Sequence, residues 1–361
     1  MREAVLRIDR AALQHNLQRV RECMPGARVL AMVKADAYGH GAVEAARALQ
    51  GADGFGVALL QEAEALRNAG ISRPITLLEG VFTAAEMQAV VLHQFTTIVH
   101  QPAQIALLEA VPASTPVDVW LKLDTGMHRL GFAVEQAAEA YRTLRAMPGV
   151  RSVGLITHFA RADEPAQVHT HEQIERFRAL QRQLEAETGD TIPDSLANSA
   201  GILAWPAATG SWVRPGIMLY GSSPFADRSA DTLGLRPVMT LSSRLIAIRE
   251  LQAGEPVGYG GTWVAPRDTR IGVVAIGYGD GYPRHAANGT PVLVNGVRVP
   301  LAGRVSMDMI TVDLGDVPAT IGDHCVLWGE GLPADEVAAA SGTISYELFC
   351  KVTARVQRIL A

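Results

Sequence analysis

The sequence has little cysteine and no long hydrophobic run. Its three cysteines, Cys23, Cys325 and Cys350, are odd in number and far apart, which favours free thiols in a reducing compartment over a disulfide framework. The first ten residues, MREAVLRIDR, are charged where a signal peptide is apolar. No apolar run approaches the roughly 18 residues of a membrane span. We therefore expect a cytoplasmic protein with no membrane partner.

Basic runs and several common catalytic motifs are also missing. The chain has 32 Lys and Arg against 37 Asp and Glu, a net charge of −5, so nothing points to nucleic acid as a partner. The sequence contains no P-loop, GxSxG, HExxH or CxxC motif, and these absences argue against the corresponding nucleotide, hydrolase and metal sites. We expect no metal.

The length and the pattern of the first two-thirds predict a barrel. A single core rarely exceeds roughly 250–300 residues, so 361 residues predict two domains. Short aliphatic runs alternate with helical patterns, as in a (β/α)₈ TIM-like barrel. A doubly wound sheet is the rival, but its usual GxGxxG turn is absent. The expected barrel strands are residues 29–33, 54–59, 75–78, 95–99, 117–123, 150–157, 195–198 and 212–214.

After about residue 235 strand signals dominate, so we predict a barrel over 1–232 and a mostly β domain over 233–361. Before the barrel, Val5–Ile8 forms an opening strand and Asp9 caps the following helix. An Asn295-Gly296 pair between β-branched runs predicts a hairpin, and a final helix is expected over 346–360. The other expected strands of this part are residues 245–248, 271–276 and 309–314.

Polar residues follow several expected barrel strands, where the chemistry of this fold is found. Lys34 directly follows the first strand; a desolvated lysine has a lowered pKa and forms Schiff bases with aldehydes. A surface lysine starting a loop is the alternative, although the polar, glycine-containing segment after it favours function. Arg129 lies in a glycine-flanked loop after the fifth strand, where it either clamps a carboxylate or faces water.

The last three strand ends carry further candidates. His158 ends the sixth strand and is either a site residue or a structural histidine. Ser199 follows the seventh strand, and Arg214, Gly216 and Ile217 follow the eighth. Loops at these two positions commonly bind phosphate in this fold, so we expect the Ser199 hydroxyl and the neighbouring backbone amides to do so.

Three glycine-rich loops of the second part are unusual. Tyr259 stands between glycines that provide no wall for packing, although such a tyrosine is more often a packing residue. The other two loops hold Tyr278 with Arg284, and Arg304 with Met307.

Taken together, these segments resemble the alanine racemase family, which are pyridoxal-phosphate enzymes with a barrel followed by a β domain. The resemblance covers essentially the whole chain, and several long motifs occur in the family's order. They are AMVKADAYGH (31–40), LDTGMHR (123–129), VRPGI (213–217), GYGGTW (258–263) and SMDM (306–309).

The resemblance implies pyridoxal 5′-phosphate on Lys34 and a role for each matching residue. Cofactor binding is assigned to Lys34, Tyr38, His158, Ser199, Arg214, Gly216, Ile217 and Tyr346. Arg129 and the backbone at Met307 contact the substrate carboxylate, and Lys122 matches a lysine that is often carbamylated and supports Arg129. Tyr278 and Tyr346 form an inner gate, with Asp163, Arg284 and Arg304 outside it.

A two-base racemisation of alanine follows from these assignments. Lys34 serves one face of the substrate and Tyr259 the other, with His158 and Arg214 stabilising the phenolate. In the family the tyrosine reaches the other subunit, so a homodimer is implied. The product supplies peptidoglycan, or the reaction serves alanine catabolism.

Three alternatives stay open at this stage. The nearest is a broader amino-acid racemase or a decarboxylase on the same architecture; the pair Arg129 and Tyr259 favours racemisation, because a decarboxylase must release the carboxylate. A cofactor-carrying regulatory protein resembles only the first 230 residues and has no use for the β domain. A barrel hydrolase needs paired carboxylates at strand ends, and none is clearly placed.

Overall fold

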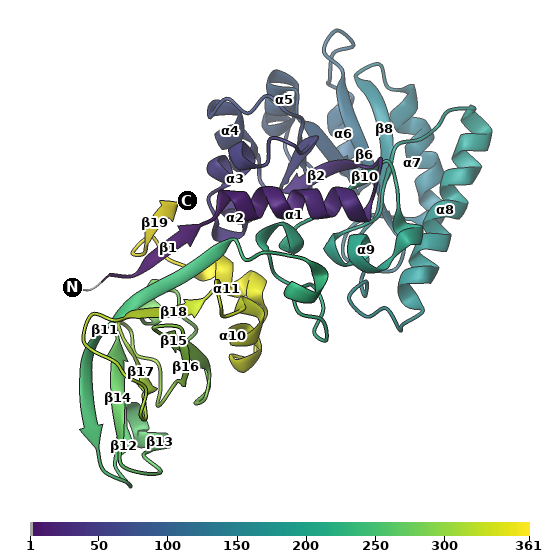
Figure 1. Ribbon diagram of the computed structural model, residues 1–361. Coiled ribbons are helices and arrows are strands. Elements are labelled where there is room, and N and C mark those ends of the chain that lie inside the picture. The colour runs from purple at the N-terminus through teal and green to yellow at the C-terminus, as the bar shows by residue number, and fades with distance from the viewer. Residues whose placement is uncertain (1–2) are drawn as a thin grey trace.

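The barrel is a closed ring of parallel strands. The computed structural model describes residues 3–361, and Figure 1 shows a barrel wrapped by helices beside a mostly β part. Eight strands pair in a ring that closes through β5 with β6 and β10 with β2. They are β2 (Arg28–Met32), β3 (Gly54–Val57), β4 (Ile75–Leu77), β5 (Thr96–Val99), β6 (Val117–Asp124), β8 (Val150–Ile156), β9 (Asp194–Ser195) and β10 (Trp212–Val213). The predicted eight-stranded barrel is confirmed.

Helices cover the outside of this ring because one face of each is apolar. In the first of them Leu13, Leu17 and Val20 are buried at helical spacing, and Asp9 caps it by accepting the Ala12 N–H at 2.9 Å, as predicted. The helices are α1 (Arg10–Cys23), α3 (Ala42–Ala48), α4 (Leu60–Asn68), α5 (Ala84–His93), α6 (Pro102–Leu108), α7 (Val134–Ala146), α8 (His169–Thr188) and α9 (Ser199–Ala204). A short strand β7 (Phe132–Ala133) pairs in parallel with the end of β6. The 3₁₀ turns η1 (Pro206–Ala208), η2 (Ile217–Tyr220) and η3 (Asp231–Leu233) complete this part.

The second part is built on a mixed eight-stranded sheet. Its strands are β1 (Val5–Ile8), β11 (Met239–Leu251), β14 (Thr269–Val274), β15 (Pro291–Val294), β16 (Val297–Pro300), β17 (Ile310–Asp313), β18 (His324–Trp328) and β19 (Gln357–Leu360). Smaller elements are β12 (Pro256–Val257), β13 (Trp263–Val264), η4 (Tyr259–Gly261), η5 (Tyr278–Asp280), α10 (Ala334–Ala340) and α11 (Ser345–Lys351). The predicted hairpin is confirmed: Asn295 and Gly296 have φ of 49° and 82° between β15 and β16.

The prediction of a helix over 346–360 is wrong. Helix α11 ends at Lys351, the chain turns extended at Val352 (φ −60°, ψ 123°), and the last residues form β19. This strand pairs in parallel with β1, whose other edge pairs with β11. Two termini far apart in sequence thus meet in one sheet, and the backbone hydrogen bonds offered by β1 outweigh the local helical pattern. Over residues 3–361, the structure has no helix with the length and hydropathy needed to span a membrane.

Candidate active site

Lys34 opens an unusual turn at the carboxyl end of β2. This helical turn is α2 (Lys34–Gly39), but residues 35–38 all have left-handed angles, with φ of 52–54° and ψ of 41–52°. Each such non-glycine residue costs about 1–2 kcal/mol, so the surrounding structure must hold the turn in place. Its effect is to leave Lys34 half-buried at the strand end while burying Tyr38.

Four cations gather around His158 at this end of the barrel. Arg214, Lys122, Arg129 and Lys34 all act electrostatically on the His158 ring. Burial first, and then these four charges, hold the pKa of His158 well below its ordinary value. The imidazole is therefore neutral at physiological pH, and the site carries an excess of positive charge that favours anionic ligands.

The same surroundings act on Lys122, which projects from β6. Burial lowers the pKa of Lys122 to about 8, and Arg214, Arg129 and Lys34 contribute to this shift, in that order, against a smaller opposing effect of Glu79. This amine is therefore mostly charged at neutral pH, but a larger fraction of it is uncharged than for an ordinary lysine, and the uncharged amine can act as a nucleophile.

Arg214 is fully buried and is held by neutral oxygen atoms. Its guanidinium donates to the Ser195 carbonyl (2.9 Å) and hydroxyl (2.7 Å), the Thr157 carbonyl (2.6 Å) and the Leu196 carbonyl (3.2 Å). Burial lowers the pKa of Arg214 to about 10, so it stays charged. Because its anchors are carbonyl and hydroxyl groups, they fix the guanidinium without cancelling its charge.

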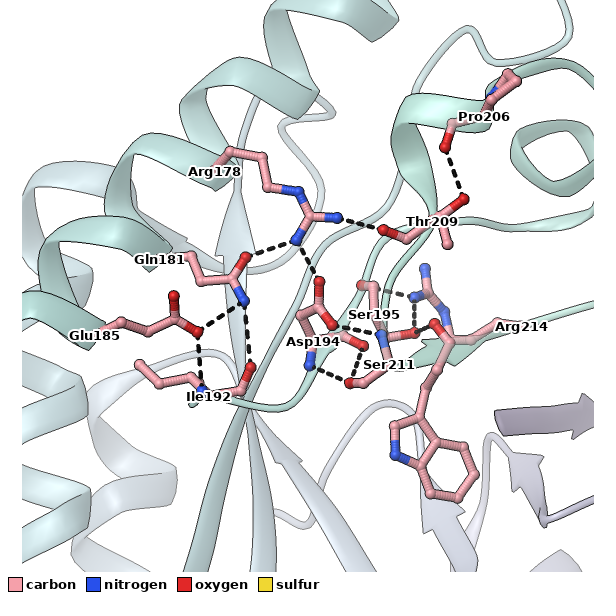
Figure 2. Close-up of polar contacts among 11 residues, drawn as sticks. Arg178, Gln181, Glu185, Ile192, Asp194, Ser195, Pro206, Thr209, Ser211 and Arg214 are labelled. Atoms are coloured by element: carbon pink, nitrogen blue, oxygen red, sulfur yellow. Dashed lines mark hydrogen bonds and ion pairs between the residues drawn. The ribbon is translucent and has the colours of Figure 1, made fainter. Parts of the chain in front are cut away.

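Figure 2 shows that Ser195 is itself part of a wider network. The preceding residue, Asp194, pairs with Arg178 of α8 and accepts the Ser211 N–H at 2.6 Å, which ties β9 to β10. Ser195 is a site residue that the sequence interpretation missed. A serine in an apolar strand was the available signal, because a buried hydroxyl requires a partner.

The His158 ring is orientated by Arg214. Its Nδ1 lies 3.5 Å from Arg214 Nη2, and since arginine can only donate, Nδ1 is the acceptor and the neutral ring carries its proton on Nε2. The contact between His158 and Arg214 lies wholly within the barrel, without Met307 or the tyrosines of the second part.

A second group of predicted residues meets beside the first. The Ser199 hydroxyl accepts the N–H groups of Gly216 (2.9 Å) and Met218 (3.3 Å), which leaves its O–H to donate to a ligand. A Cβ on Gly216 would lie 2.5 Å from the Tyr38 hydroxyl, so only glycine at this position allows that hydroxyl to approach the backbone so closely. The Tyr38 ring lies 5.8 Å from that of Tyr346, and burial raises the pKa of both phenols.

Asp163 lies near this second group and acts electrostatically on Tyr346. The start of η2 contributes Ile217, which is buried next to Gly216. Glycine backbone, hydroxyl donors and a buried turn together form a polar cradle suited to a phosphate. Over residues 3–361, the structure shows no group of three or more His, Cys, Asp or Glu side chains able to hold a metal.

Apart from Tyr346, whose ring lies beside that of Tyr38, the predicted residues of the second part are not brought to Lys34 within one chain. Tyr259 is 69% exposed, and its turn η4 lies between β12 and β13 at the end of the second part away from the barrel (Figure 1). Met307 is also exposed, and its carbonyl accepts the Gly279 N–H at 2.8 Å, which joins its loop to that of Tyr278.

Arg304 joins this exposed group. A Cβ on Gly260 would lie 3.5 Å from Arg304 Nη1, so the arginine borders the Tyr259 turn. Arg284 is exposed on the loop after η5. The structure therefore divides the predicted site into a barrel half and an exposed half on the β domain.

Comparisons with known proteins cover both parts of the chain. Family models for the alanine racemase N-terminal and C-terminal domains match residues 8–224 and 238–360. The chain belongs to the alanine racemase family. It is 53% identical over 359 residues to "Alanine racemase, biosynthetic" of Escherichia coli (strain K12), covering 99% of this chain and 98% of that one.

Solved structures of the alanine racemase family show the same fold. The biosynthetic alanine racemase of Pseudomonas aeruginosa matches with a TM-score of 0.95 and 50% identity over the whole of both chains. The alanine racemase of Acinetobacter baumannii matches with a TM-score of 0.94 and 41% identity, again over both whole chains. The protein is accordingly an enzyme of the isomerase class.

Proposed function

We propose that the protein interconverts L- and D-alanine with pyridoxal 5′-phosphate, using Lys34 and the Tyr259 of a second subunit as two bases. The observation that carries the proposal is the lysine at the end of β2 within a cluster of four cations, beside a polar cradle. Relatives that are 53% identical over nearly the whole chain are named alanine racemase.

The residues of the barrel half fit this cofactor. The cradle of Tyr38, Ser199, Gly216, Ile217 and Tyr346 has the hydroxyl donors that a phosphate needs, and Gly216 has no side chain to obstruct the Tyr38 hydroxyl. Arg214 would face the pyridine nitrogen, with Lys34 joined to the aldehyde carbon as a Schiff base. When bound, pyridoxal phosphate draws electrons from the α-carbon of an attached amino acid and makes its proton removable.

The fixed charge of Arg214 limits how far this withdrawal goes. A guanidinium that its oxygen partners hold in place disfavours protonation of a nitrogen that faces it. We infer that Arg214, by keeping this nitrogen unprotonated, would weaken the electron withdrawal that the cofactor supplies and so disfavour transamination.

Arg129 would hold the substrate carboxylate, and the Met307 backbone of the partner would contact it from the other side. We propose that Lys122 is carbamylated, because its lowered pKa leaves free amine to react with carbon dioxide. The carbamate is an anion and would pair with the Arg129 guanidinium. Carbamylation would therefore replace a cation that repels Arg129 by an anion that attracts it.

The two bases would act on opposite faces of the α-carbon. Lys34 Nζ would hold or return the proton on one face of the α-carbon. The Tyr259 hydroxyl does so on the other face. Its phenolate needs a stabilising neighbour, and neutral His158, which carries its proton on Nε2 and is backed by Arg214, can donate to it.

A homodimer with two shared sites follows from the exposure of Tyr259. Its position at the end of the β domain suits it to enter the barrel of a second chain. Tyr278 and Tyr346 would form the inner gate of that shared site, with Asp163, Arg284 and Arg304 outside it. We also place the protein in the cytoplasm, in keeping with its three unpaired cysteines.

The test combines chemistry on the cofactor with turnover. Purified protein supplied with pyridoxal phosphate should convert L-alanine to D-alanine, with serine and lysine as competing substrates to measure breadth. Borohydride should fix the cofactor to the peptide that contains Lys34, and Lys34→Ala should abolish both results. Attachment to another peptide, or no D-alanine from a protein that retains the cofactor, would contradict the proposal.

A further inference from the structure

The left-handed turn after β2 raises the question of what holds it. Four successive residues, 35–38, are in a conformation that is unfavourable for every non-glycine residue. Part of the support is local. Buried His40 donates from Nδ1 to the carbonyls of Ala37 and Tyr38, both at 2.9 Å, and Glu62 accepts the Ala35 N–H at 2.6 Å.

The turn also packs against Tyr220 and Phe349, and a further support comes from the far end of the chain. Arg358 of β19 donates from Nη1 to the Asp36 carboxylate at 3.1 Å and from Nη2 to the Gly39 carbonyl at 2.9 Å. The other Asp36 oxygen accepts the Ala42 N–H at 2.7 Å. A Cβ on Gly41 would lie 3.1 Å from Arg358 Nη1, so the guanidinium packs closely on this backbone. One side chain thus joins the middle of the turn, at Asp36, to its end, at Gly39.

We propose that Arg358 is a positioning residue for Lys34 and Tyr38, which it holds in place by bridging Asp36 and Gly39. The inference rests on the proposed function, in which Lys34 carries the cofactor and Tyr38 contacts its phosphate. These two residues lie on either side of Asp36, within the turn that Arg358 braces. A change in the turn therefore moves the covalent anchor and the phosphate donor together.

The backbone of Arg358 is well placed for this role because β19 is pinned on both sides of it. Leu6 of β1 is its register partner. At the end of the chain the Ala361 N–H donates to the Ile8 carbonyl at 2.9 Å, and the Ala361 carbonyl accepts the Arg10 N–H at 3.1 Å. The second sheet in this way fixes a guanidinium against the lysine turn of the barrel.

The experiment compares Arg358→Met with a matched control, Arg298→Met. Arg298 forms a similarly exposed pair with Glu336 within the second part, so its loss reports the cost of an exposed ion pair alone. Asp36 and Arg358 border a cavity of about 460 Å³, and methionine therefore meets no crowding there. Both variants are prepared with cofactor, and retention of pyridoxal phosphate is measured by equilibrium dialysis.

We expect Arg358→Met to retain the cofactor about 5- to 30-fold more weakly than the wild type, and Arg298→Met to match the wild type. Hydrogen exchange of the peptide spanning 34–42 should quicken in Arg358→Met while the other barrel strands stay protected. Arg358→Lys, which keeps the charge but loses the two-pronged contact, should fall between. If Arg358→Met does not fold, Asp36→Asn, which keeps an oxygen for the Ala42 N–H, should show the same two changes.

The outcomes separate the positioning role from the proposed function. A wild type that retains no pyridoxal phosphate contradicts the proposed function. A wild type that retains it, with Arg358→Met and Arg298→Met equal in retention and in exchange of the 34–42 peptide, overturns the positioning role. General loss of protection across the barrel in Arg358→Met would also overturn it, because that result shows a role in overall stability only.

Discussion

Replacing Lys122 by methionine should stabilise the cofactor-free protein at pH 7. Burial and the neighbouring cations lower the pKa of Lys122 from its ordinary value of 10.5 to about 8. At about 1.4 kcal/mol per pKa unit this corresponds to about 3 kcal/mol against the charged form, and partial exposure of the side chain reduces it to about 2–3 kcal/mol. Methionine has a similar volume and carries no charge to be desolvated.

The effect has a definite dependence on pH. The folded pKa is below the unfolded one, so between about pH 8 and 10.5 the unfolded wild type binds more protons than the folded one. Wild-type stability therefore rises across this window, and the advantage of Lys122→Met should shrink and vanish near pH 10.5. Below pH 8 both states are charged and the advantage is constant.

Thermal unfolding in buffer free of carbon dioxide measures this difference. A gain of about 2–3 kcal/mol raises the midpoint by about 4–12 °C for a domain of this size. Lys351→Met is the control, because Lys351 is exposed on α11 and its replacement should change stability by at most about 0.5 kcal/mol. Added bicarbonate should stabilise the wild type alone. A Lys122→Met variant less stable than the wild type at pH 7, or a difference that does not vary between pH 8 and 10.5, would refute the reasoning.

Three further predictions concern the two bases and the Arg214 anchor. Tyr259→Phe should lower racemisation in both directions by about 10²–10⁴-fold. NMR should nevertheless show that exchange of the α-proton with solvent persists for D-alanine and collapses for L-alanine. Equal loss of exchange for the two enantiomers would exclude Tyr259 as a face-specific base. A mixture of Lys34→Ala and Tyr259→Phe chains should regain part of the activity, because a dimer with one chain of each kind has one intact shared site. Proven exchange of chains without recovery of activity would count against shared sites. Ser195→Ala removes an acceptor 2.7 Å from buried Arg214 and should cost about 1–3 kcal/mol of unfolding free energy, with Ser195→Thr closer to the wild type; an unchanged thermal midpoint in both variants would contradict this anchor.

The barrel could be predicted from the sequence because its signals are local. Each strand is a short aliphatic run, and helical patterns with their own caps lie between the runs, as the capped helix after Asp9 illustrates. The hairpin at Asn295 and Gly296 was equally local, since only a few residues tolerate positive φ. Strand β19 could not be predicted in this way. Its helical-looking pattern was overridden by pairing with β1, at the opposite end of the chain.

The site shows the same limit at the level of side chains. Lys34, Arg129 and Arg214 were found because they follow strands of a fold whose chemistry lies at strand ends. Ser195 was missed because it holds Arg214 through its carbonyl and hydroxyl groups, a contact that depends on the distance between β9 and β10. The exposure of Tyr259 is likewise a three-dimensional fact. Its assignment as a base came from the resemblance and stays a proposal.

The electrostatics of the barrel half connect the separate proposals. The ligands proposed for it are anions or become anions: a phosphate, a substrate carboxylate, a phenolate and a carbamate on Lys122. The cations that would receive them repel one another: burial first, and then Arg214, Arg129 and Lys34, lower the pKa of Lys122. Arg214 adds to this repulsion because its carbonyl and hydroxyl partners leave its charge uncancelled. The mutual repulsion of these positive charges is therefore relieved by bound anions, and cofactor binding should stabilise the fold by linkage.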